Sequence, residues 1–144
     1  MSTTTLRFQG QDHSLEIDAT IEKDDSLPSS GDACVQVSVR SSGFVGHNDL
    51  WLHHSDLTEF ARQLVELDRT LKGEAKLTSI SPNELELIVR SVSSRGNLAL
   101  SGSTGYWVQS ENTRFWHAVS FGFEFETGQL SEAINGTWLV HYMA

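Results

Sequence analysis

The sequence predicts an α+β fold, in which a single antiparallel sheet of about six to eight strands packs against one main α-helix at about residues 55–72. Three observations favour this fold. Apolar and polar residues alternate in short segments on both sides of one helical pattern. The segments between successive strand patterns are short enough for hairpins, and the strand–helix–strand repeat of a parallel sheet is missing from the pattern.

The chain before the helix predicts three strands. Residues 13–22 alternate between apolar and charged side chains with a period of two, as a half-buried strand does. The alternation recurs at 34–40 and, less regularly, at 44–52. Residues 23–32 collect Asp, Ser, Pro and Gly and are expected to form a loop. Residues 1–12 are expected to form a poorly ordered or edge segment.

The helix is predicted by apolar residues at intervals of three and four, which place them on one face. Ser55 is expected to cap its N-terminus, and Gly73 is expected to take the left-handed position that ends it. We expect this apolar face to be buried against the sheet. Its members are Leu57, Phe60, Ala61, Leu64, Leu67 and Leu71.

After the helix, alternation predicts further strands at 75–80, at 85–90, from 98 to about 102, and at 115–125. The intervening residues 103–113 are polar apart from two aromatic side chains and one valine, and are expected to form a loop.

The last part of the chain has helical spacing. Leu130, Ala133 and Ile134 indicate a short second helix near residues 129–135. The pattern of residues 137–142 fits a strand and a helix equally well.

Length and composition limit the classes of function. The 144 residues fit one domain, residues 1–144. Nineteen acidic against ten basic residues give a formal net charge of −9, which disfavours nucleic acid and anionic membranes as partners. The single cysteine, Cys34, cannot form an internal disulfide, and neither a signal peptide nor a membrane span is evident. A cytoplasmic location is expected.

Catalytic motifs are missing from the sequence, and we expect no enzymatic activity, cofactor or bound metal. One alternative comes from His47, Asp49 and His53, which lie close together in sequence. Two imidazoles and a carboxylate can hold zinc or iron, so these residues are the candidate ligands of a small metal- or ligand-binding domain, which could be an enzyme. The competing interpretation is that they are ordinary polar residues at a strand-to-helix corner.

Acidic residues and aromatics suggest a surface for a basic protein partner. Residues 12–32 contain seven acidic residues and one lysine. Trp and Tyr are enriched among the residues that dominate binding energies. The candidate partner-binding residues are Asp24, Asp25, Asp32, Tyr106, Trp107 and Glu111. The alternative is that the acids only keep the protein soluble and that Trp107 covers an open end of the sheet.

Three segments resemble a known group of small bacterial proteins. They are DLTEFARQLVELDRTLKGEAKLTS (residues 56–79), NELELIVRSVSSRGNLALSG (83–102) and FGFEFETGQL (121–130). The group comprises immunity proteins of the wall-associated and Rhs-type polymorphic toxin systems, with related domains of unknown function. The resemblance covers roughly residues 40–134 and rests on scaffold residues.

The resemblance implies a single-domain cytoplasmic antitoxin, which binds a cognate toxin effector domain and occludes its active site or target surface. It leaves the activity of that toxin open, with nuclease, ADP-ribosyltransferase and deaminase all compatible. It also leaves the oligomeric state open.

Overall fold

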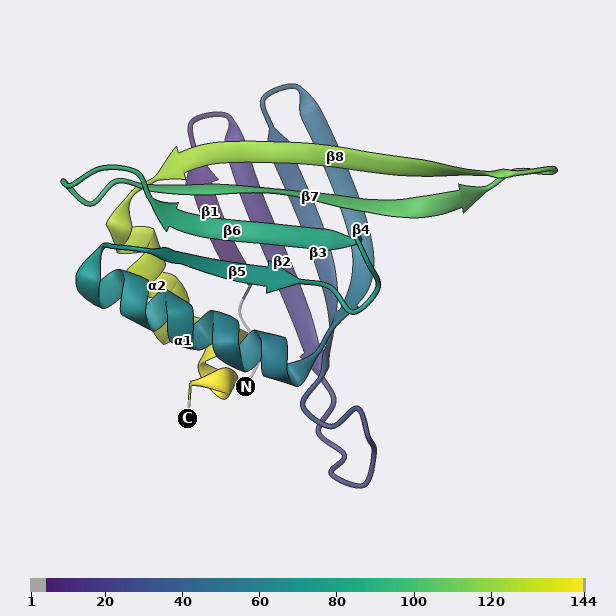
Figure 1. The fold of residues 1–144 in the computed structure, drawn as a ribbon, viewed down its shortest axis with the longest axis horizontal. Helices are drawn as coiled ribbons and strands as arrows, with labels where there is room; N and C mark the ends of the chain where they lie inside the picture. The colour runs from purple at the N-terminus through teal and green to yellow at the C-terminus, as the bar shows by residue number, and fades with distance from the viewer. Residues whose placement is uncertain (1–4, 144) are drawn as a thin grey trace.

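The α+β class is confirmed, but the single predicted sheet is wrong. A computed structural model describes residues 5–143 and contains two antiparallel sheets of four strands each, in the orders β1-β2-β3-β4 and β5-β6-β7-β8. The strands of one sheet cross those of the other at a steep angle (Figure 1). The strands are β1 (Leu6–Gly10), β2 (His13–Ile21), β3 (Ala33–Ser41), β4 (Phe44–Leu52), β5 (Glu74–Thr78), β6 (Leu85–Ser91), β7 (Leu98–Gln109) and β8 (Arg114–Phe125).

Burial explains why the chain forms two sheets. Each sheet has one apolar face, and the two faces meet in one buried cluster that also includes residues of the helices. One helix could not have covered the apolar face of eight strands. The long helix α1 (His54–Thr70) separates β4 from β5 in the chain, and each sheet is a simple meander before or after it. Alternation along a strand shows which face is buried, but it does not show which strands are neighbours.

The first sheet follows the predicted alternation. Leu15 and Ile17 on β2 are paired with Val39 and Val37 on β3, and all four side chains are buried. The polar residues between them, Glu16 and Ser38, lie on the outer face. Strand β1, within the segment expected to be poorly ordered or an edge, is the edge strand beside β2. Residues 1–4 of that segment lie outside the described residues.

Helix α1 begins one residue earlier than predicted. His53, not Ser55, is the N-cap, and its Nδ1 accepts a hydrogen bond from the backbone N–H of Ser55 at 3.2 Å. The buried face of α1 contains the predicted residues, with one exception. Leu71 is only half-buried because the helix ends at Thr70, and Leu71 itself takes the left-handed cap conformation (φ 56°).

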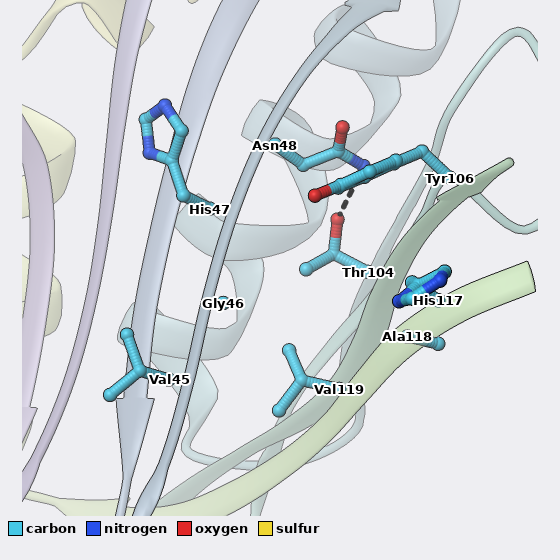
Figure 2. Close-up of a pocket in the computed structure, with 9 residues that line it drawn as sticks. All are labelled: Val45, Gly46, His47, Asn48, Thr104, Tyr106, His117, Ala118 and Val119. Carbon is cyan, nitrogen blue, oxygen red and sulfur yellow. Dashed lines mark hydrogen bonds between the residues drawn. The ribbon is translucent and has the colours of Figure 1, made fainter. Parts of the chain in front are cut away.

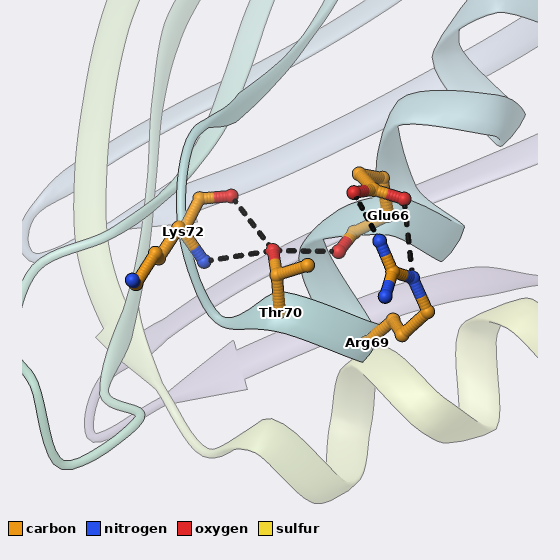
Figure 3. A network of polar contacts seen from close by, with 4 residues as sticks. All are labelled: Glu66, Arg69, Thr70 and Lys72. Atoms are coloured by element: carbon orange, nitrogen blue, oxygen red, sulfur yellow. Dashed lines mark hydrogen bonds and ion pairs between the residues drawn. The ribbon is translucent and has the colours of Figure 1, made fainter.

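Polar contacts close the C-terminal end of α1 (Figure 3). The Thr70 hydroxyl lies 2.9 Å from the carbonyl oxygen of Glu66 and accepts from the backbone N–H of Lys72 at 3.2 Å. Arg69 forms an ion pair with Glu66 at 2.6 Å on the exposed side. Gly73, which was predicted to be the left-handed cap, has a φ of +89° two residues after Leu71 and is the last residue before β5.

Three helical segments lie together at one side of the two sheets. Helix α1 packs along β5, and it also contacts α2 (Thr127–Gly136) and the 3-10 helix η1 (Trp138–Tyr142). The predicted short helix near 129–135 is therefore present, and in the segment 137–142 the 3-10 helix η1 follows Thr137, which is its extended N-cap. Among residues 5–143, no helix is both long and apolar enough to cross a membrane.

Tyr142 is expected to make folding sensitive to alkaline pH. Its hydroxyl donates to the carbonyl oxygen of Gly31 at 2.8 Å, and burial, with a contribution from the charge of Asp32, raises its pKa to about 12. Tyr142 ionises near pH 10 in the unfolded chain. The stabilisation that its neutral hydroxyl gives the folded chain is therefore complete below pH 10 and is lost as the pH rises toward 12. Between pH 10 and pH 12, the free energy of unfolding of wild type should fall by up to about 2–3 kcal/mol more than that of Tyr142→Phe.

Urea unfolding at a series of pH values measures this loss. Tyr106→Phe, at an exposed tyrosine, retains Tyr142 and should show the wild-type pH dependence. Parallel stability curves for wild type and Tyr142→Phe would contradict the assignment.

Candidate functional site

The longest hairpin of the protein extends beyond the rest of its sheet. Strand β6 pairs with β7 only as far as Leu85 opposite Thr104, whereas β7 and β8 continue to pair as far as Gln109 opposite Arg114. Residues 105–118 therefore form a two-stranded arm that projects from the body of the protein (Figure 1). We use "the arm" for these residues.

The arm corrects the prediction of a loop at residues 103–113. Only residues 110–113, at its tip, are not in strands. Tyr106 and Trp107 lie on strand β7 instead of a loop, opposite His117 and Trp116 of β8. The loop was predicted because both faces of the arm are exposed, so that polar and apolar residues do not alternate as they do in a half-buried strand.

Aromatic side chains occupy both faces of the arm. On one face Trp107 and Trp116 meet edge to face with ring centroids 5.3 Å apart, and the guanidinium of Arg114 lies 4.0 Å from the Trp107 ring centroid. On the other face Tyr106 stacks with His117 at 6.5 Å. Trp107 is 52% exposed and Phe115 is 53% exposed. Phe115 and Trp116 are not in the candidate set chosen from the sequence, because they continue the Phe-rich pattern of a predicted core strand.

A buried polar cluster anchors the base of the arm to the other sheet (Figure 2). The side-chain amide of Asn48 on β4 donates to Thr104 Oγ1 at 3.0 Å and to the carbonyl oxygen of Gly105 at 2.9 Å. Thr104 in turn donates to the carbonyl oxygen of Glu84 at 2.6 Å. A buried amide with satisfied partners fixes one arrangement, so the arm leaves the body in a defined direction.

Glycines allow close packing near this base. A Cβ at Gly105 would lie 2.6 Å from a ring atom of Trp116, and a Cβ at Gly46 would lie 2.3 Å from Val119 Cγ1. Both positions therefore need a residue without a side chain. Gly46 brings β4 against β8, and Gly105 lets the Trp116 ring lie over the arm backbone.

The surface is hollowed on both sides of the arm. A cavity of about 350 Å³ lies between β4 and the arm, and Tyr106 and His117 line it (Figure 2). A second cavity, of about 520 Å³, lies between the arm and the turn before β6, and Trp107 and Trp116 line it. Each pair of aromatic side chains thus borders a concave surface, which is the shape that an inserted side chain of a partner needs.

The structure divides the candidate partner-binding residues into separate groups. Tyr106, Trp107 and Glu111 lie on the arm, with Glu111 exposed at its tip. Asp24 and Asp25 are exposed on the loop between β2 and β3, which extends from a different part of the molecule (Figure 1). Hydrogen bonds from the hydroxyl and backbone N–H of Ser26 lower the pKa of Asp24.

Asp32 is not available as a docking residue. It is 6% exposed, and its Oδ1 accepts a hydrogen bond from the backbone N–H of His54 at 2.8 Å. This contact joins the end of the β2–β3 loop to the first residue of α1. The sequence shows the acidic residue in its loop, but its burial depends on a helix terminus 22 residues further along the chain.

The structure also bears on the alternative in which His47, Asp49 and His53 bind a metal. His47 and Asp49 share the exposed face of β4, with His47 Nε2 3.7 Å from Asp49 Oδ1. His53 lies beyond the end of β4, where its ring stacks on His54 at 4.4 Å. Within the described part of the chain, the three side chains close enough to share a metal ion are Asp32, His53 and His54. The proposed set of His47, Asp49 and His53 is therefore not the one that the fold brings together.

Exposed aromatic side chains on a fixed scaffold are typical of proteins that bind other proteins. Comparison with known families agrees with this class: the sequence model of the WapI-like family of immunity proteins matches residues 4–137. The chain belongs to this family, and the resemblance found from its sequence is confirmed. No curated protein and no solved structure matches it.

Proposed function

We propose that this chain is an immunity protein that binds a cognate toxin domain and blocks it without catalysing a reaction itself. Its membership of the WapI-like immunity family carries the proposal. The proposed site of action is the cytoplasm, in keeping with the single Cys34, which cannot form an internal disulfide.

The arm is the proposed docking surface. Its aromatic side chains are exposed on both faces, and aromatic residues are enriched at protein–protein interfaces. The strand pairing and the Asn48 contacts hold these side chains in place before binding. A rigid surface loses less conformational entropy on association than a flexible loop does. The aromatic side chains that make up the surface are Tyr106, Trp107, Phe115, Trp116 and His117.

The proposal is tested in cells that express a candidate toxin domain from a gene adjacent to the one that encodes this chain. Growth should stop with the toxin alone and resume when this chain is expressed with it. A Trp107→Ala/Trp116→Ala double variant should protect poorly, whereas Val140→Ala, an exposed position on η1, should protect fully. Toxicity that wild type leaves unchanged would contradict the immunity function, and full protection by the double variant would contradict only the choice of the arm.

The acidic loop is expected to act on the rate of association. With a net charge of −9, the chain attracts a basic partner, and the exposed Asp24 and Asp25 add to this attraction at long range. Reversing both charges with Asp24→Lys and Asp25→Lys should slow association about tenfold at low salt and leave dissociation nearly unchanged.

Stopped-flow mixing at several salt concentrations measures this effect. The control is Glu124→Lys with Glu132→Lys, which makes the same change in net charge on exposed residues outside the loop. A larger loss of rate in the control than in the loop variant would contradict the role of the loop.

A further inference from the structure

Three side chains that can bind metal meet where the β2–β3 loop rejoins the sheet. Asp32 precedes β3, whereas His53 follows the last residue of β4 and His54 is the first residue of α1. Pairing of Ala33 with Leu52 places these segments side by side. One ligand atom from each of the three side chains lies within 4.8 Å of the others.

Local contacts hold these groups in a defined orientation. The hydrogen bond from the His54 N–H fixes one oxygen of the Asp32 carboxylate, and stacking fixes the His53 ring on the His54 ring. Ser55 Oγ lies 2.7 Å from His53 Nδ1. Binding of a metal through Nε2 would place the ring proton on Nδ1, which would then donate a hydrogen bond to Ser55 Oγ in place of the cap contact that it accepts from the Ser55 N–H. Metal-binding histidines in proteins commonly donate a hydrogen bond from their second ring nitrogen to such a partner.

The charge of Asp32 favours a cation at this position. The carboxylate is buried, and among residues 5–143 no lysine or arginine side chain forms an ion pair with it. Burial of a carboxylate is costly unless hydrogen bonds or an opposite charge compensate it. The N-terminus of α1 supplies part of the compensation, and a divalent cation would supply more.

We propose that Asp32, His53 and His54 form a binding site for a divalent transition-metal ion, with Zn²⁺ as the best match. Two imidazole nitrogens and one carboxylate oxygen suit zinc and leave a fourth position for water. They do not suit Ca²⁺ or Mg²⁺, which need mainly oxygen ligands. The metal joins the acidic β2–β3 loop to α1, so that its role is structural. This proposal replaces the sequence-based expectation that no metal is bound.

The test is a calorimetric titration of metal-stripped, tag-free protein with ZnCl₂, together with its melting temperature in the presence and absence of zinc. Wild type should bind one equivalent and melt at a higher temperature with zinc, because a ligand that binds only the folded state stabilises it. Asp32→Asn keeps an oxygen that can accept from the His54 N–H, and His54→Ala leaves the N-cap intact. Each should weaken zinc binding at least about tenfold.

The matched control is His47→Ala, which removes an exposed histidine near Asp49 and should bind zinc as wild type does. Absence of zinc binding by wild type would overturn the proposal. So would loss of binding in His47→Ala with retention in His54→Ala, since the metal would then lie on β4. Ca²⁺ binding of equal strength would also contradict the assignment of donor atoms.

Discussion

Replacing Trp107 with alanine should weaken the complex with the toxin domain by about 2–4 kcal/mol, the range for a dominant interface residue. This corresponds to a dissociation constant roughly 30- to 1000-fold larger. Trp107 is exposed in the free chain, packs edge to face on Trp116 and is covered on its ring by Arg114. Its ring is therefore held in position before the partner excludes water from it. The prediction depends on the proposed function.

Calorimetry or surface plasmon resonance measures this loss, which should arise mainly from faster dissociation. Trp51→Ala is the matched control, because Trp51 is 44% exposed but lies on β4 outside the arm. It should bind the toxin domain like wild type. Equal affinities of wild type and Trp107→Ala, with both proteins folded by circular dichroism, would show that the arm is not the docking surface.

Replacing Phe60 with alanine should lower the free energy of unfolding by about 3–5 kcal/mol. Phe60 is fully buried on α1 and belongs to the cluster that joins the helix to both sheets. Removing its ring loses the transfer free energy of the apolar atoms and leaves a cavity that the neighbouring strands cannot fill without moving.

Urea denaturation at neutral pH measures this loss. Val65→Ala, at an exposed position of the same helix, should change the free energy of unfolding by less than about 0.5 kcal/mol. Similar losses for the two variants would mean that the buried face of α1 is assigned incorrectly.

Helices and strands with one buried face could be predicted from the sequence, because burial of one face makes apolar residues recur at a regular spacing. The alternation of Leu15, Ile17 and Ala19 with charged residues identified β2, and the spacing of Leu57, Phe60 and Leu64 identified α1. The division into two sheets could not be predicted in this way, because strand pairing depends on contacts between distant residues. The period of each strand would be the same in a single sheet.

The candidate site was predictable only where residue type was informative. Tyr106 and Trp107 stood out as aromatic residues in a polar segment, and both lie on the arm. Their partner Trp116 was left out of the candidate set, since β8 changes from exposed to buried along its length without a change in aromatic content. Asp32 was grouped with the exposed acidic residues because its contact with α1 exists only in the folded chain.

Hydrogen exchange of the free chain and of its complex with the toxin domain locates the bound surface without any substitution. On binding, amide exchange should slow in residues 105–118, with smaller changes in the acidic loop between β2 and β3. Slower exchange confined to that loop or to α1, with the arm unchanged, would show that the arm is not the docking surface.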